Sequence, residues 1–376
     1  MKNKYIKIGI VTFPISEAGT TPLSNLVYTL CFLSGKIFLI TGGAGYTTFA
    51  NNKQVYAYNV EHSARARHTF RRIVNYIKTQ VIISTKLWKL RKQVDIWVFF
   101  IGAEGLILPI FIAKLLNKKV IIASAGSLTK SAQAANDVLA GSLALLQSFT
   151  YNLADRIILY SNGLIEEHSL QKYKSKISIT QNHFVNFNLF KIDTQLNARR
   201  DLIGYIGRFS EEKGILNFVK AIPAILKEEH EFCFLIGGDG QLKDEIEKYS
   251  TKYNLGGKIN ITGWISQDKL PHYLNELKLI VLPSYTEGLP NIMLEAMACG
   301  TPILASPVGA IPDLIKDGET GFIMADNSPE CIARNIIRAL NHPYLEKIAD
   351  NGRALVEKEF TFEKAVERYR ELLNSL

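Results

Sequence analysis

Two glutamates beside a predicted helix start are the residues of this chain best placed for chemistry. In LPSYTEGLPNIMLEAMACGTPIL (282–304), a strand and a short loop precede a helix that is predicted to start near Asn291 and to stop at Gly300. Proline before a helix, asparagine at its start and glycine at its stop are typical of helix termini. The free N–H groups and partial positive charge of such a start suit a phosphate or pyrophosphate. Glu287 precedes the helix and Glu295 lies about one turn inside it, so two carboxylates are predicted to flank one anion site.

The two carboxylates are suited to binding hydroxyl groups. A carboxylate accepts hydrogen bonds from vicinal hydroxyls, so one glutamate could hold a sugar and the other a ribose. The alternative is structural, with Glu287 as a turn residue and Glu295 on a solvated helix face. A pair of glutamates is a weak motif, and its spacing alone leaves both interpretations open.

Cations that could assist an anion site occur in GYIGRFSEEKG (204–214). A strand leads to Gly207 and Arg208, and Lys213 precedes the next predicted helix. Arginine offers a fork of donors to phosphate oxygens, and lysine offers a point charge. Another strand-to-helix turn, IGGDGQL (236–242), contains Gly238 and allows a close approach of backbone to a ligand. The alternative for both cations is ordinary surface charge.

The elements that must position these residues alternate between strands and helices. The strands are predicted at 6–13, 36–41, 95–101, 119–126, 155–161, 202–209, 232–240, 259–265, 277–284 and 302–306. The helices are predicted at 22–35, 105–116, near 131–152, and at 214–228, 241–253, 291–299, near 329–340 and over the last residues. This alternation favours doubly wound parallel sheets with ligands at the carboxyl ends of the strands.

A polar stretch, NFNLFKIDTQLNARRD (186–201), is the predicted connection between two such domains. We therefore expect a first Rossmann-like domain over 1–197 and a second over 198–360. The last segment, 361–376, has an amphipathic helical pattern and is predicted to pack back toward the first domain.

Composition excludes several classes of protein. Of 376 residues 47% are hydrophobic, which is enough for two cores and excludes global disorder. The four cysteines are far apart and form no C-x-x-C pair, which argues against disulfides and zinc. The apolar run before Pro14 is too short for a signal peptide, and 96–116 fits a buried strand and helix better than a membrane span. The expectation is a cytoplasmic protein.

The positive charge is concentrated in the first half. Residues 1–195 contain 23 Lys+Arg and 9 Asp+Glu, whereas residues 196–376 contain 21 and 26. Nine of these cations and no acid lie between Glu61 and Asp95, in the segment Arg65–Lys92. At 100° per residue, one narrow apolar stripe is predicted within it: Phe70, Ile73, Val74, Ile77 and Val81.

Two interpretations of this basic segment stay open. A basic amphipathic helix suits an anionic membrane surface, where each Lys or Arg contributes about 1 kcal/mol. Alternatively, the stripe packs on the domain core and the charges are solvated. Nucleic acid is not expected as a partner, because no recognised binding module accompanies the charge.

In their order along the chain, the motifs of 200–365 resemble those of the retaining glycosyltransferases of family 4, which have the GT-B fold. The similarity covers GYIGRFSEEKG, LIGGDGQL, ITGWIS and VLPSYTEGLPNIMLEAMACGTPILASPVGAIPDLIKDGETGF. It implies two Rossmann-like domains that face a cleft, and transfer of a sugar from a UDP- or GDP-linked donor with retention. The acceptor it favours is a lipid-linked glycan, polysaccharide or glycolipid at the cytoplasmic membrane face, reached by a peripheral enzyme.

The resemblance also implies roles for individual residues. Glu287 would hold the donor sugar and Glu295 the ribose, while Arg208 and Lys213 would bind the pyrophosphate. Backbone or side-chain contacts to the donor are implied for Gly19, Gly207, Gly238, Gly288, Leu289, Pro290, Asn291 and Ile292. No metal or other cofactor is expected, and the chain contains no D-x-D. Ala125 stands where many members have a donor-contacting histidine, and His183 is interpreted as structural.

Two alternatives come from other classes of protein. LITGGAGY (39–46) is glycine-rich like the turn of an NAD-dependent sugar epimerase or dehydratase. However, it follows the second predicted strand, has Thr48 where the third glycine would stand, and no Y-x-x-x-K occurs in the chain. The other alternative is a non-catalytic nucleotide-sugar-binding protein. Within the same fold, a phosphorylase or nucleotide-sugar hydrolase also stays open.

Overall fold

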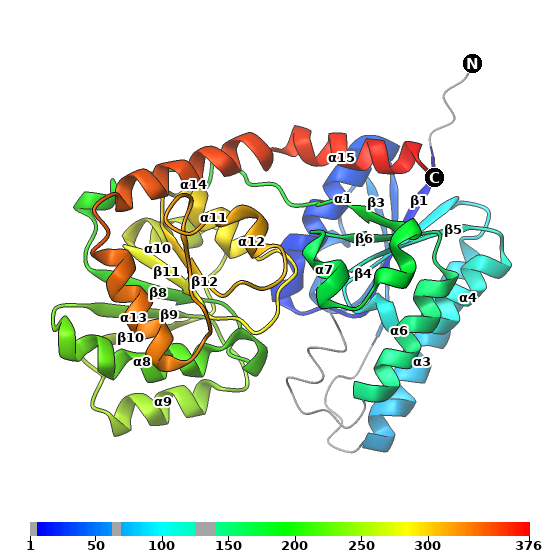
Figure 1. Cartoon of the computed structure of the whole chain (residues 1–376). Coiled ribbons are helices and arrows are strands. Elements are labelled where there is room, and N and C mark those ends of the chain that lie inside the picture. The colour runs from blue at the N-terminus through cyan, green and yellow to red at the C-terminus, as the bar shows by residue number, and fades with distance from the viewer. Residues whose placement is uncertain (1–5, 62–68, 125–139) are drawn as a thin grey trace. The chain divides into compact units, whose positions relative to one another are not determined.

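The computed structural model describes residues 6–61, 69–124 and 140–376. The chain forms two compact units (Figure 1). The first unit comprises Met1–His183 and Glu363–Leu376, and the second comprises Phe184–Phe362. The prediction of two doubly wound α/β units is confirmed by the sheets described below.

The described part of the first unit contains a parallel seven-stranded sheet with the order β3-β2-β1-β4-β5-β6-β7. Its strands are β1 (Ile8–Thr12), β2 (Ile37–Thr41), β3 (Val55–Asn59), β4 (Ile96–Phe100), β5 (Lys119–Ala123), β6 (Arg156–Leu159) and β7 (Ile177–Ile179). Every residue of β1 and β4 is buried. These strands are almost continuous apolar runs because helices cover both faces of a parallel sheet.

Helices of the first unit connect these strands and close its core. They are α1 (Thr20–Ser34), α2 (Ala44–Phe49), α3 (Thr69–Lys89), α4 (Ile107–Leu115), α6 (Ala140–Leu153), α7 (Gly163–Glu167) and α15 (Phe362–Asn374). From the C-terminal helix α15, Tyr369, Leu372 and Leu373 join the core formed by α1, β1 and β2. The C-terminal helix is therefore part of the first unit, although the chain reaches it only after completing the second.

The described second unit has a six-stranded parallel sheet with the order β10-β9-β8-β11-β12-β13. Its strands are β8 (Leu202–Ile206), β9 (Cys233–Gly237), β10 (Ile259–Gly263), β11 (Leu279–Leu282), β12 (Ile303–Ala305) and β13 (Phe322–Ile323). Its helices are α8 (Ile215–Glu228), α9 (Lys243–Lys252), α10 (Leu270–Glu276), α11 (Asn291–Ala298), α12 (Ile311–Leu314), α13 (Pro329–Leu340) and α14 (Leu345–Glu359). The chain order reverses between the neighbouring strands β8 and β11, which makes their carboxyl ends the switch point of the sheet.

The boundary between the units lies at residues 183 and 184, fourteen positions before the predicted one at 197 and 198. The reason is that the polar connection packs on the second unit. The Arg199 guanidinium is buried and donates to the carbonyl oxygens of Leu277 and Cys299 at 3.0 and 2.6 Å. Burial lowers the pKa of Arg199 to about 10. The side chain of Asn275 accepts from the backbone of Asp193 at 2.8 Å.

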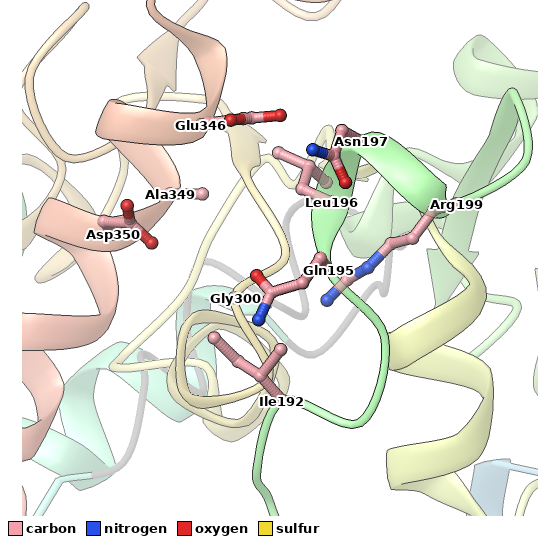
Figure 2. A pocket seen from close by; sticks show the side chains of 9 residues that line it. All are labelled: Ile192, Gln195, Leu196, Asn197, Arg199, Gly300, Glu346, Ala349 and Asp350. Atoms are coloured by element: carbon pink, nitrogen blue, oxygen red, sulfur yellow. The ribbon is translucent and has the colours of Figure 1, made fainter.

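Figure 2 shows how this connection meets the end of α11. Ile192 and Arg199 lie beside Gly300, and Ala349 and Asp350 of α14 approach from the other side. The pocket between them has a volume of only about 90 Å³. It lies at the C-terminal end of α11, the end away from Glu287, and the structural arginine Arg199 is one of its lining residues.

The glycine-rich LITGGAGY lies at the end of β2, as predicted, and its glycines serve packing. Gly43 has a φ of +60°, and a Cβ there would come within 2.5 Å of the Ile15 carbonyl oxygen. The Ala44 N–H donates to that same oxygen at 3.0 Å. A Cβ on Gly42 would come within 2.1 Å of the Val60 oxygen. The loop is thus glycine-rich because two other backbone segments lie against it.

Candidate functional site

The carboxyl ends of β8 and β11 bring together the two loops that the sequence singles out. The loop after β8 carries Arg208 and Lys213, and the loop after β11 carries Glu287. Because β8 and β11 are parallel neighbours, both loops leave the sheet at the same edge. The two loops therefore meet at the carboxyl ends of the strands, which is where doubly wound sheets bind their ligands.

Lys213 and Glu287 form an ion pair across these loops. The Lys213 Nζ lies 2.7 Å from Glu287 Oε1, and the two side chains are 20% and 9% exposed. The same carboxylate oxygen accepts a hydrogen bond from Ser284 Oγ at 2.7 Å. The structural alternative, in which Glu287 is only a turn residue, is therefore not supported by its surroundings. Its carboxylate is fixed by two donors in a desolvated position.

A glycine allows the two loops to approach so closely. Gly214 has a left-handed φ of +66°, and a Cβ there would come within 2.0 Å of the Pro283 carbonyl oxygen. Tyr285, two residues after Pro283, donates its N–H to the carbonyl oxygen of Glu212 at 2.9 Å. These contacts set the position of Lys213, which directly precedes Gly214.

Arg208 lies at the same edge of the sheet with its side chain half exposed. Its Nη2 pairs with Glu212 Oε1 at 3.0 Å. The Arg208 carbonyl accepts a hydrogen bond from the hydroxyl of buried Tyr205 at 2.7 Å. Tyr205 is within electrostatic reach of Glu287, Arg208 and Glu212 alike, and burial is the main reason that its pKa lies well above the ordinary value. The sequence-predicted cations and the first glutamate therefore belong to one charged cluster.

Glu295 lies on α11 and is buried rather than solvated. Its Oε1 accepts a hydrogen bond from Gln267 Nε2 at 2.7 Å. Burial raises the pKa of Glu295 to about 7, and the hydrogen bond from Gln267 opposes that shift. A carboxyl of this kind changes its charge near neutral pH. The sequence had not indicated Gln267, which comes from the loop before α10.

The predicted helix start is present, and backbone contacts hold it. Pro290 is the N-cap residue of α11, which runs from Asn291 to Ala298. The Gly288 carbonyl accepts from Ala310 N–H at 2.8 Å. Leu289 is buried, whereas Asn291 and Ile292 are partly exposed. The first N–H groups of α11 therefore point out of the helix at the same sheet edge as Glu287.

Two glycines join the loops after β8 and β9. The Gly207 N–H donates to the Gly237 oxygen at 2.9 Å. Gly238 has a φ of +138°, and a Cβ there would come within 1.8 Å of the Gly207 oxygen. Both glycines therefore have a structural reason to be glycine, besides the donor contact that the resemblance implies.

Three hydroxyl groups at this edge were missed by the sequence analysis. They are buried and have no hydrogen-bond partner among the described residues: Ser210 Oγ, Thr286 Oγ1 and Ser306 Oγ. They follow β8, β11 and β12 respectively. Buried polar groups without a partner within the protein are rare and call for an explanation, such as a role in binding a ligand. No sequence signal marks them, because serine and threonine are common in loops.

Not all predicted site residues fall in this unit. Gly19 belongs to the first unit, in a short 3-10 helix (Glu17–Gly19) before α1, where a Cβ would come within 3.1 Å of Ile15 Cβ. Ala125 lies outside the described residues. His183 is buried, with its ring 4.7 Å from that of Tyr160. Within 6–61, 69–124 and 140–376, no cluster of three or more His, Cys, Asp or Glu side chains could hold a metal ion.

The apolar stripe of the basic segment does not pack on the core. Four of its residues are exposed by 42–76% of their surface: Phe70, Ile73, Ile77 and Val81. The buried side of α3 is formed instead by Thr79, Gln80, Ile83, Ser84 and Leu87. Arg65 and Arg67, at the start of the segment, lie outside the described residues. In the described part of the chain, none of the helices has the length and hydropathy to span a membrane.

Comparison with known proteins agrees with this arrangement. Residues 187–355 match the family Glycosyl transferases group 1. Alpha-D-kanosaminyltransferase from Streptomyces kanamyceticus is 30% identical over 178 residues, which is 46% of each chain. The lipopolysaccharide core biosynthesis glycosyltransferase LpsE from Rhizobium meliloti is 28% identical over 227 residues, 59% of this chain and 64% of LpsE. The matching segments span about half the length of the first curated relatives.

A solved structure with a similar fold matches nearly all of this chain. Anabaena HepE, in complex with UDP, has a TM-score of 0.77 and 15% sequence identity, and the match covers 99% of this chain and 100% of HepE. The second unit contains the ion pair, the helix start and the buried glutamate within the bounds of the family match. Over residues 187–355, the chain is similar to the glycosyl transferases group 1 family.

Proposed function

We propose that this protein is a retaining glycosyltransferase that moves a sugar from a nucleotide-sugar to a glycan or lipid-linked acceptor. The observation that carries the proposal is the Lys213–Glu287 ion pair beside the start of α11, at the switch point of the second sheet. A cation, a carboxylate and free helix N–H groups at one edge supply the groups that a sugar diphosphate needs. Related proteins named as kanosaminyl and lipopolysaccharide core transferases support the same reaction class.

Each charged residue has a separate role in this proposal. Arg208 and Lys213 neutralise the diphosphate, whose negative charge grows as the bond to the anomeric carbon breaks. Electrostatic stabilisation of a developing charge by groups already in place is a large catalytic contribution. Glu287 accepts hydrogen bonds from the donor sugar, and Glu295 accepts hydrogen bonds from the ribose. We include in this proposal that the protein is a member of glycosyltransferase family 4 and that the reaction retains the configuration at the anomeric carbon.

Arg208 and Lys213, together with the start of α11, would neutralise the leaving diphosphate without a metal ion. The direct test is to incubate the full chain with a panel of UDP- and GDP-sugars and to measure released nucleoside diphosphate. Release should depend on a glycan or lipid acceptor and should be unchanged by EDTA. Release without acceptor would indicate a nucleotide-sugar hydrolase, and binding without release would indicate a non-catalytic protein.

We also propose that the first unit binds the surface of an anionic membrane, as a peripheral cytoplasmic protein would. Exposed apolar side chains extend from α3 onto two further helices: Leu108, Phe111 and Leu115 of α4, and Leu145 and Phe149 of α6. A hollow of about 440 Å³ lies among Ile77, Phe111 and Phe149. Exposed Arg71, Arg72 and Lys78 lie on α3 beside the apolar residues. Apolar surface flanked by cations suits an anionic lipid interface.

Co-sedimentation with vesicles tests the membrane part separately. The full chain should sediment with vesicles containing phosphatidylglycerol and much less with phosphatidylcholine alone, and salt should weaken the binding. Equal binding to both kinds of vesicle, or binding to neither, would refute the membrane part. It would leave the transferase activity to be judged from nucleotide release.

A further inference from the structure

A groove of about 670 Å³ opens on the first unit away from the loops that follow its strands. Lys7 precedes β1, Lys36 precedes β2 and Gln93 precedes β4, so the groove lies at the amino-terminal edge of the sheet. Its volume is within the range of about 300–1,000 Å³ that is typical of small-ligand pockets. None of its lining residues belongs to the charged cluster of the second unit or to the exposed apolar face of α3, α4 and α6.

One wall of the groove consists of aromatic rings. Phe38 of β2 and Tyr56 of β3 are paired in register, and their rings stack with centroids 5.2 Å apart and planes at 23°. Tyr58, two residues after Tyr56, lines the same groove. Tyr56 is 45% exposed although it lies on a strand. Flat, exposed ring faces can stack on the C–H faces of a sugar ring, as they stack on other apolar surfaces.

The polar groups of the groove include two ammonium groups and an amide, besides the hydroxyl groups of Ser34 and the tyrosines. Lys36 Nζ donates to the Tyr56 hydroxyl at 3.0 Å and lies 5.3 Å from the centre of that ring. Lys7 and Gln93 add an ammonium and an amide, and no Asp or Glu is among the lining residues of the described chain. The neighbouring Asp95 carboxylate accepts from the Lys7 backbone N–H at 3.3 Å. The ammonium groups of Lys7 and Lys36, with no carboxylate among the described lining residues, favour an anionic ligand.

We infer that this aromatic groove binds a short acidic oligosaccharide. The ring faces would stack on the sugars, and Lys7 and Lys36 would pair with carboxylates on them. The lining residues by themselves indicate an anionic ligand that can stack on aromatic rings. That this ligand is a saccharide rests on the proposed function. The groove would hold part of an acidic glycan away from the reacting end.

The second unit contains a matched control for the aromatic contribution. Tyr253 is also 45% exposed, its ring stacks on Tyr249 at 4.4 Å, and Lys252 Nζ lies 5.4 Å from its centre. These residues lie one turn apart at the end of α9, not across two strands. A general effect of removing an exposed tyrosine beside a lysine should therefore appear at Tyr253 as well.

Calorimetric titration of the full chain with trigalacturonate and with neutral maltotriose tests the inference. Trigalacturonate should bind at least fivefold more tightly than maltotriose, and added salt should reduce the difference. Tyr56→Ala should weaken trigalacturonate binding at least tenfold, Tyr56→Phe should retain most of it, and Tyr253→Ala should leave it unchanged. Lys36→Met should weaken binding of trigalacturonate but not of maltotriose. If Tyr56→Ala loses its thermal unfolding transition, it is not folded and its binding is not interpreted. The inference is then tested by Lys36→Met, which should weaken trigalacturonate binding, and by Tyr56→Phe, which should retain it.

Several outcomes would overturn the inference. They are absence of saturable trigalacturonate binding, equal weakening by Tyr253→Ala, and displacement of bound trigalacturonate by UMP. Nucleotide release, measured on the same variants with a short acceptor, separates this inference from the proposed function. Normal release without saccharide binding refutes the groove alone, whereas saccharide binding without any release refutes the transferase activity alone.

Discussion

Lys213 and Glu287 are 74 positions apart in the sequence, and their Nζ and Oε1 atoms are 2.7 Å apart in the structure. The pair joins the loops after β8 and β11, where the order of the second sheet reverses. The positive charge of Lys213 is therefore partly neutralised by the carboxylate. A sugar diphosphate that binds here would share the lysine with Glu287, and this relationship determines the first prediction.

Lys213→Met should lower turnover far more than it weakens nucleoside binding. The lysine charge is needed most when the diphosphate leaves, so the loss belongs to the transition state. Removing one such donor costs about 2.7–4 kcal/mol, or roughly 10²–10³ in kcat. The measurement compares kcat for nucleotide release with the Kd for uridine. Arg208→Ala should behave in the same way.

Lys220→Met is the matched control for this substitution. Lys220 is exposed on α8, the helix that Lys213 precedes, and it carries the same charge. Its removal should change kcat by less than twofold. If Lys213→Met reduced uridine binding and turnover by equal factors, the assigned role of the lysine would be wrong.

Gly214→Ala should destabilise the second unit and disturb the site. An L-residue in the left-handed region costs about 1–2 kcal/mol. In addition, the new Cβ would come within 2.0 Å of the Pro283 oxygen, so the two loops must separate. Thermal unfolding should shift down and nucleotide release should fall. Gly256→Ala, where a Cβ meets nothing within 4 Å, should change neither value.

The sequence predicted the strands and helices that carry local signals. The start of α11 was found because proline, asparagine and a terminal glycine mark it, and the α13 bounds match because Ser328 caps the helix by accepting from the Cys331 N–H. β3 and β7 were missed because they are edge strands with polar residues among the apolar ones, and β13 was missed because it has only two residues. α14 was missed although it is 15 residues long, because two of its five buried positions are the small residues Ala349 and Gly352, which weaken the apolar pattern.

The tertiary partners of the site were beyond the reach of the sequence. Glu287 and Glu295 were identified, but the residues that fix them, Ser284 and Gln267, carry no motif of their own. The unit boundary lies before the predicted one for a similar reason. A polar segment resembles a linker in the sequence, whereas in the structure the N–H groups of Asp193 and Thr194 donate to the side chain of Asn275 in α10.

Glu295 should make the stability of the protein depend on pH in an unusual direction. Its pKa is about 7 in the folded chain and 4.5 ordinarily, because burial disfavours the charged form. The folded state therefore holds a proton that the unfolded state has lost between these values, and stability falls as pH rises from about 4.5 to 7. The full effect is about 3 kcal/mol. Urea unfolding at pH 5 and pH 8 should show this fall in the wild type and lose it in Glu295→Gln.

Glu247→Gln is the control for the pH experiment, since Glu247 is exposed on α9. It should keep the wild-type dependence on pH. Donor binding supplies a second readout: hydroxyl groups that donate to the Glu295 carboxylate favour its ionised form, so UDP-sugar should bind more tightly at pH 8 than at pH 6. A wild-type stability that rises between pH 5 and pH 7 along with that of Glu295→Gln would contradict the assigned burial effect.

Thr286→Val should weaken donor binding without destabilising the protein. Thr286 Oγ1 is buried and has no hydrogen-bond partner in the described structure, so valine removes an unsatisfied group and no internal bond. The free energy of unfolding should stay equal or rise by up to about 1 kcal/mol. If the hydroxyl serves the donor, the Kd for UDP-sugar should increase about tenfold, which corresponds to about 1.4 kcal/mol.

Thr301→Val separates this effect from a general loss of hydroxyl groups. The buried Thr301 hydroxyl donates to Leu274 O at 2.7 Å and accepts from Arg199 at 2.8 Å, at the C-terminal end of α11. This substitution should cost about 1–3 kcal/mol of stability and leave donor binding unchanged. If Thr301→Val weakened donor binding and Thr286→Val only lowered stability, the proposed role of Thr286 would be refuted.

Ile77→Ser combined with Phe111→Ser should remove vesicle binding while leaving the fold intact. Both side chains are exposed, by 53% and 42%, so the folded chain loses little buried surface, and each change should cost within about 0.5 kcal/mol. Ile83→Ser, on the buried side of the same helix, should instead destabilise the chain by several kcal/mol, as core substitutions of this size do. If the exposed apolar face of α3 and α4 contacts the membrane, it is needed for vesicle binding but not for folding. If the exposed pair proved as destabilising as Ile83→Ser, or if the double variant still sedimented with phosphatidylglycerol vesicles, the apolar face would not be the membrane contact.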